Sequence, residues 1–141
     1  MQRTPDATIL AFDFGVRRIG VAVGNTVTRS ARPLTTIEHA DPVARDDAIE
    51  ALVRTWQPAR LVVGLPLHAD GSEHAMTARA RTFARELEAR FALPVALEDE
   101  RHTSEIARER LRGQGRRGRA LRDEIAAQII LQAWLDGPND A

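Results

Sequence analysis

The stretch Ile9-Leu-Ala-Phe-Asp-Phe-Gly-Val-Arg-Arg-Ile-Gly-Val-Ala-Val-Gly24 decides the fold of this chain. It joins two apolar runs through Gly15 and a pair of arginines, and a lone carboxylate, Asp13, lies inside the first run. An isolated buried charge is costly, and proteins retain one mostly where a metal ion or catalysis requires it. We therefore expect Asp13 to anchor a divalent-metal site for phosphodiester hydrolysis. A buried acid satisfied by hydrogen bonds, or one that caps a turn, is the alternative.

The two apolar runs predict the first strands of a sheet. Residues 8–14 are apolar on both faces, as in a central strand. Residues 19–24 alternate β-branched residues with glycine and alanine, and this period of two indicates a second strand paired with the first in a hairpin. Residues 33–38 follow as a short third strand, and the leading Pro33 suits a strand start or a sheet edge.

Helices and strands alternate in the rest of the predicted chain. The remaining elements are a helix from the Asp41-Pro42 start signal to Trp56, a strand at 61–65, a helix at 76–91, a strand at 94–97, a helix at 103–111 and a helix at 121–135. An antiparallel meander followed by such crossovers produces a mixed sheet. We expect one α/β domain over residues 1–141, with five strands and helices on both faces.

Composition limits the class of protein. With 141 residues, 43% of them hydrophobic and 28% charged, the chain matches a globular domain that can bury a core. It has no cysteine, which excludes disulfides, thiolate metal sites and cysteine nucleophiles. No apolar segment is long enough to cross a bilayer, and the N-terminus has no apolar signal core. We therefore expect a cytoplasmic protein that does not bind membranes.

Positive charge is concentrated in one part of the sequence although the formal net charge is zero. All 20 basic residues are arginine, which genome composition would explain. Residues 101–122 nevertheless contain eight arginines and only two glutamates. A basic block beside acidic residues suits an anionic polymer. The glycine- and arginine-rich segment 113–119 has no apolar face, so we expect it to be mobile and to clamp a bound strand.

Three acidic residues fall where the predicted strands and helices end. Asp13 closes the first strand, Glu100 follows the fifth, and Asp123 lies in the first turn of the last helix. The carboxyl ends of parallel strands are the usual ligand sites of open α/β sheets. Converging carboxylates require a cation, and Mg²⁺ or Mn²⁺ prefers such oxygen ligands. A surface pair of Glu100 with Arg101 and a helix start favoured by the dipole at Asp123 remain the alternatives.

Four ordered motifs resemble the YqgF family. They are Asp13-Phe-Gly-Val-Arg-Arg-Ile-Gly-Val-Ala22, Val63-Gly-Leu-Pro-Leu67 with Asp70-Gly71, Asp99-Glu-Arg-x-Thr103, and Asp123-x-x-Ala-Ala-x-x-Ile-Leu-Gln132. The resemblance spans nearly the whole chain. Proteins of this family resemble Holliday-junction resolvases and are assigned as nucleases that mature the 5′ end of pre-16S ribosomal RNA. This chain departs from the family pattern at Asn25, His68 and His102, and none of these is a proposed triad carboxylate.

The resemblance implies a fold and a mechanism. The fold would be ribonuclease H-like, with strand order 3-2-1-4-5 and an antiparallel second strand. Asp13, Glu100 and Asp123 would form an acidic triad that binds Mg²⁺ or Mn²⁺ and promotes attack of water on a phosphodiester. Asp13 would bridge two metal ions, and the products would carry a 5′-phosphate and a 3′-hydroxyl.

Arginines around the proposed site predict contacts with nucleic acid, although each could equally be a solvated surface residue. The candidates are Arg17, Arg18 and Arg101 beside the carboxylates and Arg116 and Arg117 in the glycine-rich segment. The first three would hold the scissile phosphate through charge-assisted hydrogen bonds. His68 and His102 are either surface residues or phosphate contacts. All four phenylalanines fit the core, so we expect recognition of shape and backbone rather than base stacking.

Several function classes fit these residues. The first is a metal-dependent nuclease for structured RNA, with pre-rRNA, free or in ribosomal particles, as substrate. Cleavage of four-way DNA junctions is a close variant, for which a homodimer would suit the substrate symmetry better than a monomer. A non-catalytic RNA-binding factor of ribosome assembly is the alternative from another class. An actin-like kinase would need two domains and is disfavoured at this length, and no P-loop motif occurs.

Overall fold

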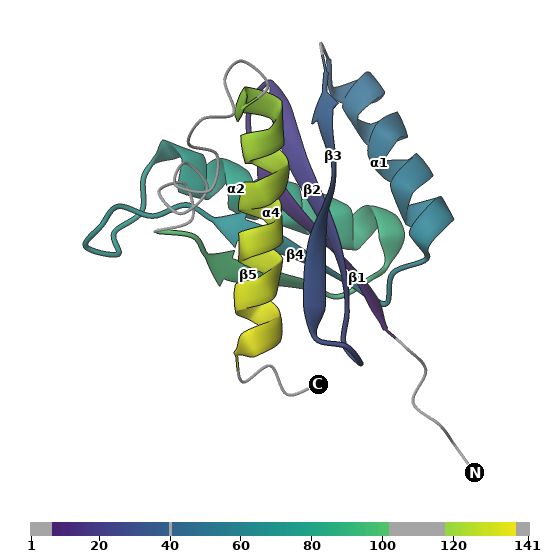
Figure 1. The fold of residues 1–141 in the computed structure, drawn as a ribbon. Coiled ribbons are helices and arrows are strands. Elements are labelled where there is room, and N and C mark those ends of the chain that lie inside the picture. The colour runs from purple at the N-terminus through teal and green to yellow at the C-terminus, as the bar shows by residue number, and fades with distance from the viewer. Residues whose placement is uncertain (1–6, 40, 102–117, 138–141) are drawn as a thin grey trace.

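A five-stranded mixed sheet forms the centre of the structure (Figure 1). The computed structural model describes residues 7–39, 41–101 and 118–137. The strands are β1 (Thr8–Phe14), β2 (Arg18–Asn25), β3 (Ser30–Glu38), β4 (Arg60–Leu65) and β5 (Val95–Asp99). Their order is β3-β2-β1-β4-β5, with β2 antiparallel to β1 and β3, and β4 parallel to β1 and β5. The predicted strand order and the antiparallel second strand are confirmed.

Helices cover both faces of this sheet, as predicted. They are α1 (Pro42–Trp56), α2 (Ala75–Phe91) and α4 (Gly118–Asp136). One hydrophobic cluster joins Phe12 and Val63 to α1 and α2, and a second joins Ile9 and Val62 to α4 on the opposite face (Figure 1). Because both faces are buried, β1 is apolar on both of its sides up to Asp13.

The alternation in β2 separates the two cores. Its branched residues, such as Val21, belong to the cluster with α1 and α2, whereas Ala22 belongs to the cluster with α4. A Cβ atom on Gly20 would lie 1.9 Å from the carbonyl oxygen of Asp123, and one on Gly24 would lie 2.9 Å from Leu131 Cδ2. The small side chains of β2 therefore let the backbone of α4 lie directly against the sheet.

Three predicted boundaries differ from the structure by two or more residues. The third strand begins at Ser30 rather than at Pro33. Proline has no N–H, but β3 is an edge strand with a neighbour on one side only, so Pro33 can lie inside it. β5 continues to Asp99 instead of ending at 97. α4 begins at Gly118, which places Asp123 in its second turn and not its first. The predicted helix at 103–111 lies outside the described residues.

The helix ends follow local capping chemistry. The Asp41 side chain accepts a hydrogen bond from Ala44 N at 2.9 Å and caps α1, as its sequence predicts. The cap of α2 is His74, whose Nδ1 accepts from the N–H of Met76 and whose own N–H donates to Thr77 Oγ1. This second cap was not predicted. None of the described helices is long and apolar enough to cross a membrane.

Candidate active site

Two carboxyl groups meet at the carboxyl ends of the parallel strands. Asp13 is the penultimate residue of β1, and Glu100 directly follows β5, where its N–H donates to Leu65 O and extends the pairing with β4. The Asp13 and Glu100 side chains are hydrogen-bonded to each other. They are far apart in the sequence, and the parallel β1-β4-β5 arrangement brings them to one edge of the sheet.

Glycines on both neighbouring strands make room around Asp13. Asp13 pairs with Gly20 across the β1-β2 ladder, and directly opposed residues of such a ladder project to the same face. The missing side chain of Gly20 therefore admits the α4 backbone at Asp123 beside Asp13. On β4, a Cβ atom on Gly64 would lie 2.8 Å from Glu100 Oε2. These two glycines position the second and third carboxylates, a role that the sequence analysis did not assign to them.

The third predicted carboxylate, Asp123, forms an ion pair with an arginine. Arg18 Nε donates to Asp123 Oδ2 at 2.6 Å, and both side chains are largely buried. Asp123 and Asp13 nevertheless line one small pocket of about 220 Å³, and the negative charge of Asp123 contributes to the raised pKa of Asp13. Asp123 therefore lies beside the pair of Asp13 and Glu100, and Arg18 is its cationic partner.

Burial and neighbouring carboxylates raise the pKa of both members of the carboxyl pair. Burial raises the pKa of Asp13 from 3.8 to about 7, with a further contribution from Asp123, and the hydrogen bond from Glu100 opposes this rise. Burial, followed by the charge of Asp13, raises the pKa of Glu100 from 4.5 to about 9. The pair therefore holds at least one shared proton that would be released if a cation took its place.

This pair makes a prediction about stability and pH. An unfolded chain releases both protons near pH 4, whereas the folded, metal-free protein retains them to about pH 7 and pH 9. The contribution of this pair to the free energy of unfolding is therefore fully present below pH 4. It is lost as the pH rises through the folded-state pKa values, about 7 and about 9. We expect the melting temperature in chelator to fall by roughly 5 °C or more between pH 5 and pH 9. Thermal unfolding of the parent and of Glu100→Gln measures this effect. An equally steep fall in the variant would contradict the assignment.

The oxygen ligands present fit a divalent cation in part. The partly buried pair supplies oxygen atoms that have no cationic partner among the described residues. Two carboxyls in one place are the ligands that Mg²⁺ and Mn²⁺ accept. Within the described ranges, however, no three acidic or histidine side chains form a group that could hold a metal as they stand, because Asp123 faces Arg18. Asp13 and Glu100 could hold a metal directly, and Asp123 could join them only by leaving Arg18.

The structure places the five predicted phosphate-binding arginines differently with respect to the carboxylate site. Arg17 and Arg18 line the small pocket that contains Asp13 and Asp123. Arg101 lies outside this pocket, where its side chain pairs with Asp99 at 2.7 Å and approaches Ala69 O at 3.4 Å. The other two candidates, Arg116 and Arg117, lie outside the described residues.

Of the two histidines left open by the sequence, one is described. His68 is exposed in the loop before α2, and its ring lies 4.6 Å from the ring of His74, the cap of that helix. His68 is absent from the lining of the pocket that contains Asp13. His102 lies outside the described residues.

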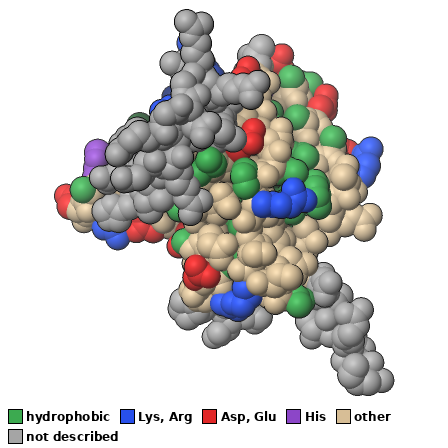
Figure 2. Space-filling model, in the orientation of Figure 1, with side chains coloured by type: hydrophobic (Ala, Val, Ile, Leu, Met, Phe, Trp, Pro, Cys, Tyr) green, Lys and Arg blue, Asp and Glu red, His purple; other side chains and the backbone are tan. Residues whose placement is uncertain are grey.

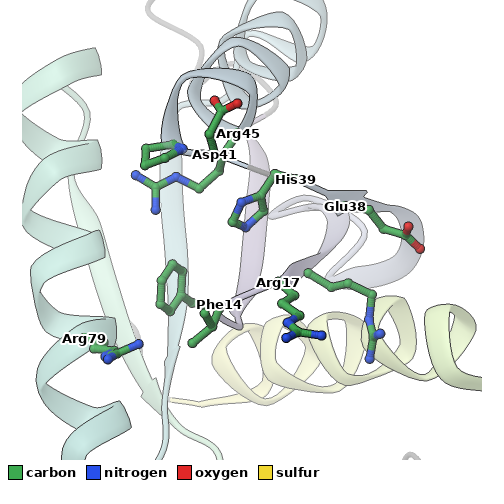
Figure 3. A pocket seen from close by; sticks show the side chains of 10 residues that line it. Phe14, Arg17, Glu38, His39, Asp41, Arg45 and Arg79 are labelled. Carbon is green, nitrogen blue, oxygen red and sulfur yellow. The ribbon is translucent and has the colours of Figure 1, made fainter.

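A larger pocket adjoins the carboxylate site and was not predicted. Its volume is about 860 Å³, and it shares Phe14, Val16, Arg17 and Arg18 with the small pocket. The full lining is Phe14, Val16, Arg17, Arg18, Glu38, His39, Asp41, Pro42, Arg45 and Arg79 (Figure 3). Phe14 packs against the core, as predicted, but it is only partly buried and its ring also lines both pockets.

The face that carries α4 has a different character. Figure 2 presents this face in the orientation of Figure 1, and acidic, basic and hydrophobic side chains are interspersed over its described part. No continuous area of one charge is visible among the coloured atoms there.

Comparisons with known proteins match this arrangement. The model of the RuvX Holliday junction resolvase family matches residues 7–137. A protein of Nitrosomonas eutropha named "Putative pre-16S rRNA nuclease" is 53% identical over 137 residues, which cover 95% of this chain and 87% of the relative. A protein of Dechloromonas aromatica with the same name is 53% identical over 135 residues, covering 94% and 92% of the two chains.

Solved structures share the fold at low sequence identity. Thermus thermophilus RuvC in complex with a Holliday junction substrate has a TM-score of 0.56 and 16% identity, with 92% of this chain and 93% of that chain covered. The Fowlpox virus resolvase in complex with Holliday junction DNA has a TM-score of 0.58 and 6% identity, with 94% and 99% covered. These likenesses establish the ribonuclease H-like fold of the resolvases. The family match over residues 7–137 and the relatives of 53% identity show that this chain belongs to the RuvX/YqgF family of Holliday-junction-resolvase-like proteins.

Proposed function

We propose that this protein is a divalent-metal-dependent endonuclease that cleaves structured RNA and matures the 5′ end of pre-16S ribosomal RNA. The observation that carries the proposal is the partly buried, hydrogen-bonded pair of Asp13 and Glu100 with Asp123 beside it. Such a pair is unfavourable for folding, so it is best explained by a catalytic need for converging carboxylates. The names of the relatives support the choice of RNA substrate. Such a step would take place in the cytoplasm.

In this proposal Asp13 and Glu100 hold Mg²⁺ or Mn²⁺ after releasing their shared proton. When bound, the metal would activate water and stabilise the leaving oxygen of the phosphodiester. The pocket of about 220 Å³ at the end of β1 is where the scissile phosphate would enter. Arg17 is exposed at its rim and makes no ion pair with another described residue, so its guanidinium is available to a phosphate oxygen.

Arg18 has a second role in this scheme. Its ion pair with Asp123, at 2.6 Å, balances a carboxylate that would otherwise repel Asp13. When Asp123 turns to a bound cation, the Arg18 guanidinium is released inside the same pocket. It could then neutralise the scissile phosphate. Arg18 would thus neutralise the charge of Asp123 before the substrate binds and the charge of the phosphate afterwards.

Cleavage of a four-way DNA junction is the competing activity, because the matching family is described as a Holliday junction resolvase. The phosphodiester chemistry would be the same, and a homodimer would place two sites on the symmetric junction. For an RNA terminus a monomer suffices. A third possibility, an RNA-binding assembly factor without catalysis, would leave the raised pKa values of Asp13 and Glu100 without a function.

A substrate comparison tests the proposal. Purified protein is incubated with a pre-16S rRNA fragment that spans the mature 5′ end and with a four-way DNA junction, each end-labelled. We expect Mg²⁺- or Mn²⁺-dependent cleavage of the RNA to products with 5′-phosphate ends, complete loss in chelator, and recovery when metal is restored. Preferential cutting of the junction would transfer the assignment to DNA. Cleavage that survives exhaustive chelation, or binding without any cleavage, would overturn it.

A further inference from the structure

The carboxylate site opens into a longer groove on the side of the sheet that carries α1 and α2. The small pocket of about 220 Å³ shares Phe14 and Arg17 with the pocket of about 860 Å³. That pocket in turn shares Phe14, Arg45 and Arg79 with a third of about 450 Å³, which reaches Thr82 on α2. These three pockets form one path, here called the α1-α2 groove, that leads away from Asp13.

Two arginines along the groove have no acidic partner in the described part of the chain. Arg17 and Arg79 are both exposed, and neither makes an ion pair or a side-chain hydrogen bond with another described residue. By contrast, Arg45 pairs with Asp46 at 3.1 Å and lies above the Phe83 ring. In Figure 3, Arg79 extends from α2 toward the pocket, whereas the carboxylate of Glu38 points away from it. Of the other acidic residues that line the groove, Asp41 caps α1 and Glu86 lies 3.7 Å from Arg45. The positive charge available to a ligand is that of Arg17 and Arg79.

His39 supplies an unused polar atom in the same place. Its N–H donates to Arg17 O at 3.2 Å, which ties the end of β3 to the β1-β2 turn. Its ring is turned toward the pocket in Figure 3, and Nε2 is buried without a hydrogen-bond partner among the described residues. A buried polar atom normally has a partner. A phosphate or ribose oxygen in the groove would provide one.

The floor of the groove is apolar. The partly buried Phe14 ring lies in the centre of Figure 3 and packs against Phe83 at 4.6 Å, and Val16 is 54% exposed beside it. Basic walls combined with an aromatic or apolar floor are typical of sites for single-stranded nucleic acid, because the backbone meets the charges and the bases meet the floor. A duplex keeps its bases stacked inside and would not use this floor.

We propose that the α1-α2 groove binds the single-stranded segment that flanks the scissile phosphate, with Arg17 and Arg79 on successive backbone phosphates. The proposal deepens the nuclease function and rests on it for the position of the scissile phosphate at Asp13. It assigns a binding role to Arg79 and His39, which no sequence motif indicated. It also gives the strand a direction of exit, away from α4 and between α1 and α2.

Equilibrium binding tests the groove without any cleavage. The Asp13→Asn protein, in chelator, is titrated into a labelled single-stranded RNA of roughly 16 nucleotides, the upper end of single-strand site sizes. Adding Arg79→Ala should weaken binding roughly 3- to 10-fold at moderate salt and lower the slope of log K against log salt by about 0.7. A DNA strand of the same sequence shares the phosphate chemistry and should respond alike, whereas an RNA duplex should respond little.

Arg85→Ala is the matched control. Arg85 is an exposed arginine of the same helix and does not line any of the three pockets. Its guanidinium lies 3.5 Å from Thr82 Oγ1 and makes no ion pair with a described residue. It should leave affinity and salt slope unchanged. If Arg79→Ala and Arg85→Ala changed the affinity equally, the proposed binding role of the groove would be refuted. It would also be refuted if Arg79→Ala weakened binding of duplex and single strand equally. Failure of the nuclease proposal would instead appear as parent protein that binds RNA but does not cleave it with Mg²⁺.

Discussion

Replacement of Asp13 by asparagine should reduce metal-dependent cleavage on the order of 10³-fold or more while RNA binding persists. The substitution removes one charge from the buried pair and leaves Glu100 as a lone ligand, since Asp123 faces Arg18. It keeps the size of the side chain and its place at the end of β1. Single-turnover cleavage of the pre-16S fragment, together with titration of the same RNA in chelator, measures both halves of the result.

The same variant should be more stable than the parent when metal is absent. Holding the carboxyl groups of Asp13 and Glu100 together destabilises the folded parent protein at pH values where they ionise. An amide in place of one carboxylate removes this electrostatic repulsion. We expect a higher melting temperature in chelator at pH 8. Glu98→Gln is the control, because burial also raises the pKa of Glu98 although it is not part of the pair. Parent-like cleavage by Asp13→Asn, or equal loss in Glu98→Gln, would refute the role of Asp13.

Substitution of Gly20 by alanine should have the largest effect on folding. Its Cβ atom would lie 1.9 Å from Asp123 O and 3.1 Å from Asp123 Cα, and backbone atoms cannot rotate away as a side chain can. α4 would have to move off β2, so we expect a loss of about 3 kcal/mol or more in the free energy of unfolding. Denaturant titration measures this loss. Cleavage should fall as well, since Asp123 moves with the helix.

Gly137→Ala is the matched control for this packing argument. Gly137 follows α4 at its other end, and its added Cβ atom would be 3.4 Å from Ala133 O, an ordinary contact. It should change the free energy of unfolding by less than about 1 kcal/mol. If Gly20→Ala were as stable as Gly137→Ala, the close approach of α4 to β2 would not be present in solution.

The two predictions share one cause, the crowding of the site. Asp13 is enclosed by a strand on each side, and Gly20 and Gly64 leave the space that Asp123 and Glu100 fill. Stability would improve if the carboxylates were fewer or farther apart. The fold instead concentrates negative charge where a cation can offset it, a common trade between stability and activity.

The first two strands and the position of Asp13 near the end of β1 were determined by the sequence. The period of two in residues 19–24 and the apolar run before Asp13 are local patterns, and local patterns report which face of a strand is buried. The Asp41 cap of α1 was predicted for the same reason, since a cap needs only its neighbours in the chain. Family motifs supplied the strand order 3-2-1-4-5, which spacing alone does not provide.

Tertiary structure alone decided how the side chains of the site pair. Asp123 binds Arg18 across 105 positions, and Arg79 on α2 lines the same groove as His39 after β3. None of these contacts has a period or a spacing in the sequence. They depend on where the helices dock, and Gly20 sets that position for α4 by the absence of a single carbon atom. Local physics thus specifies the elements, while long-range packing decides which charges meet.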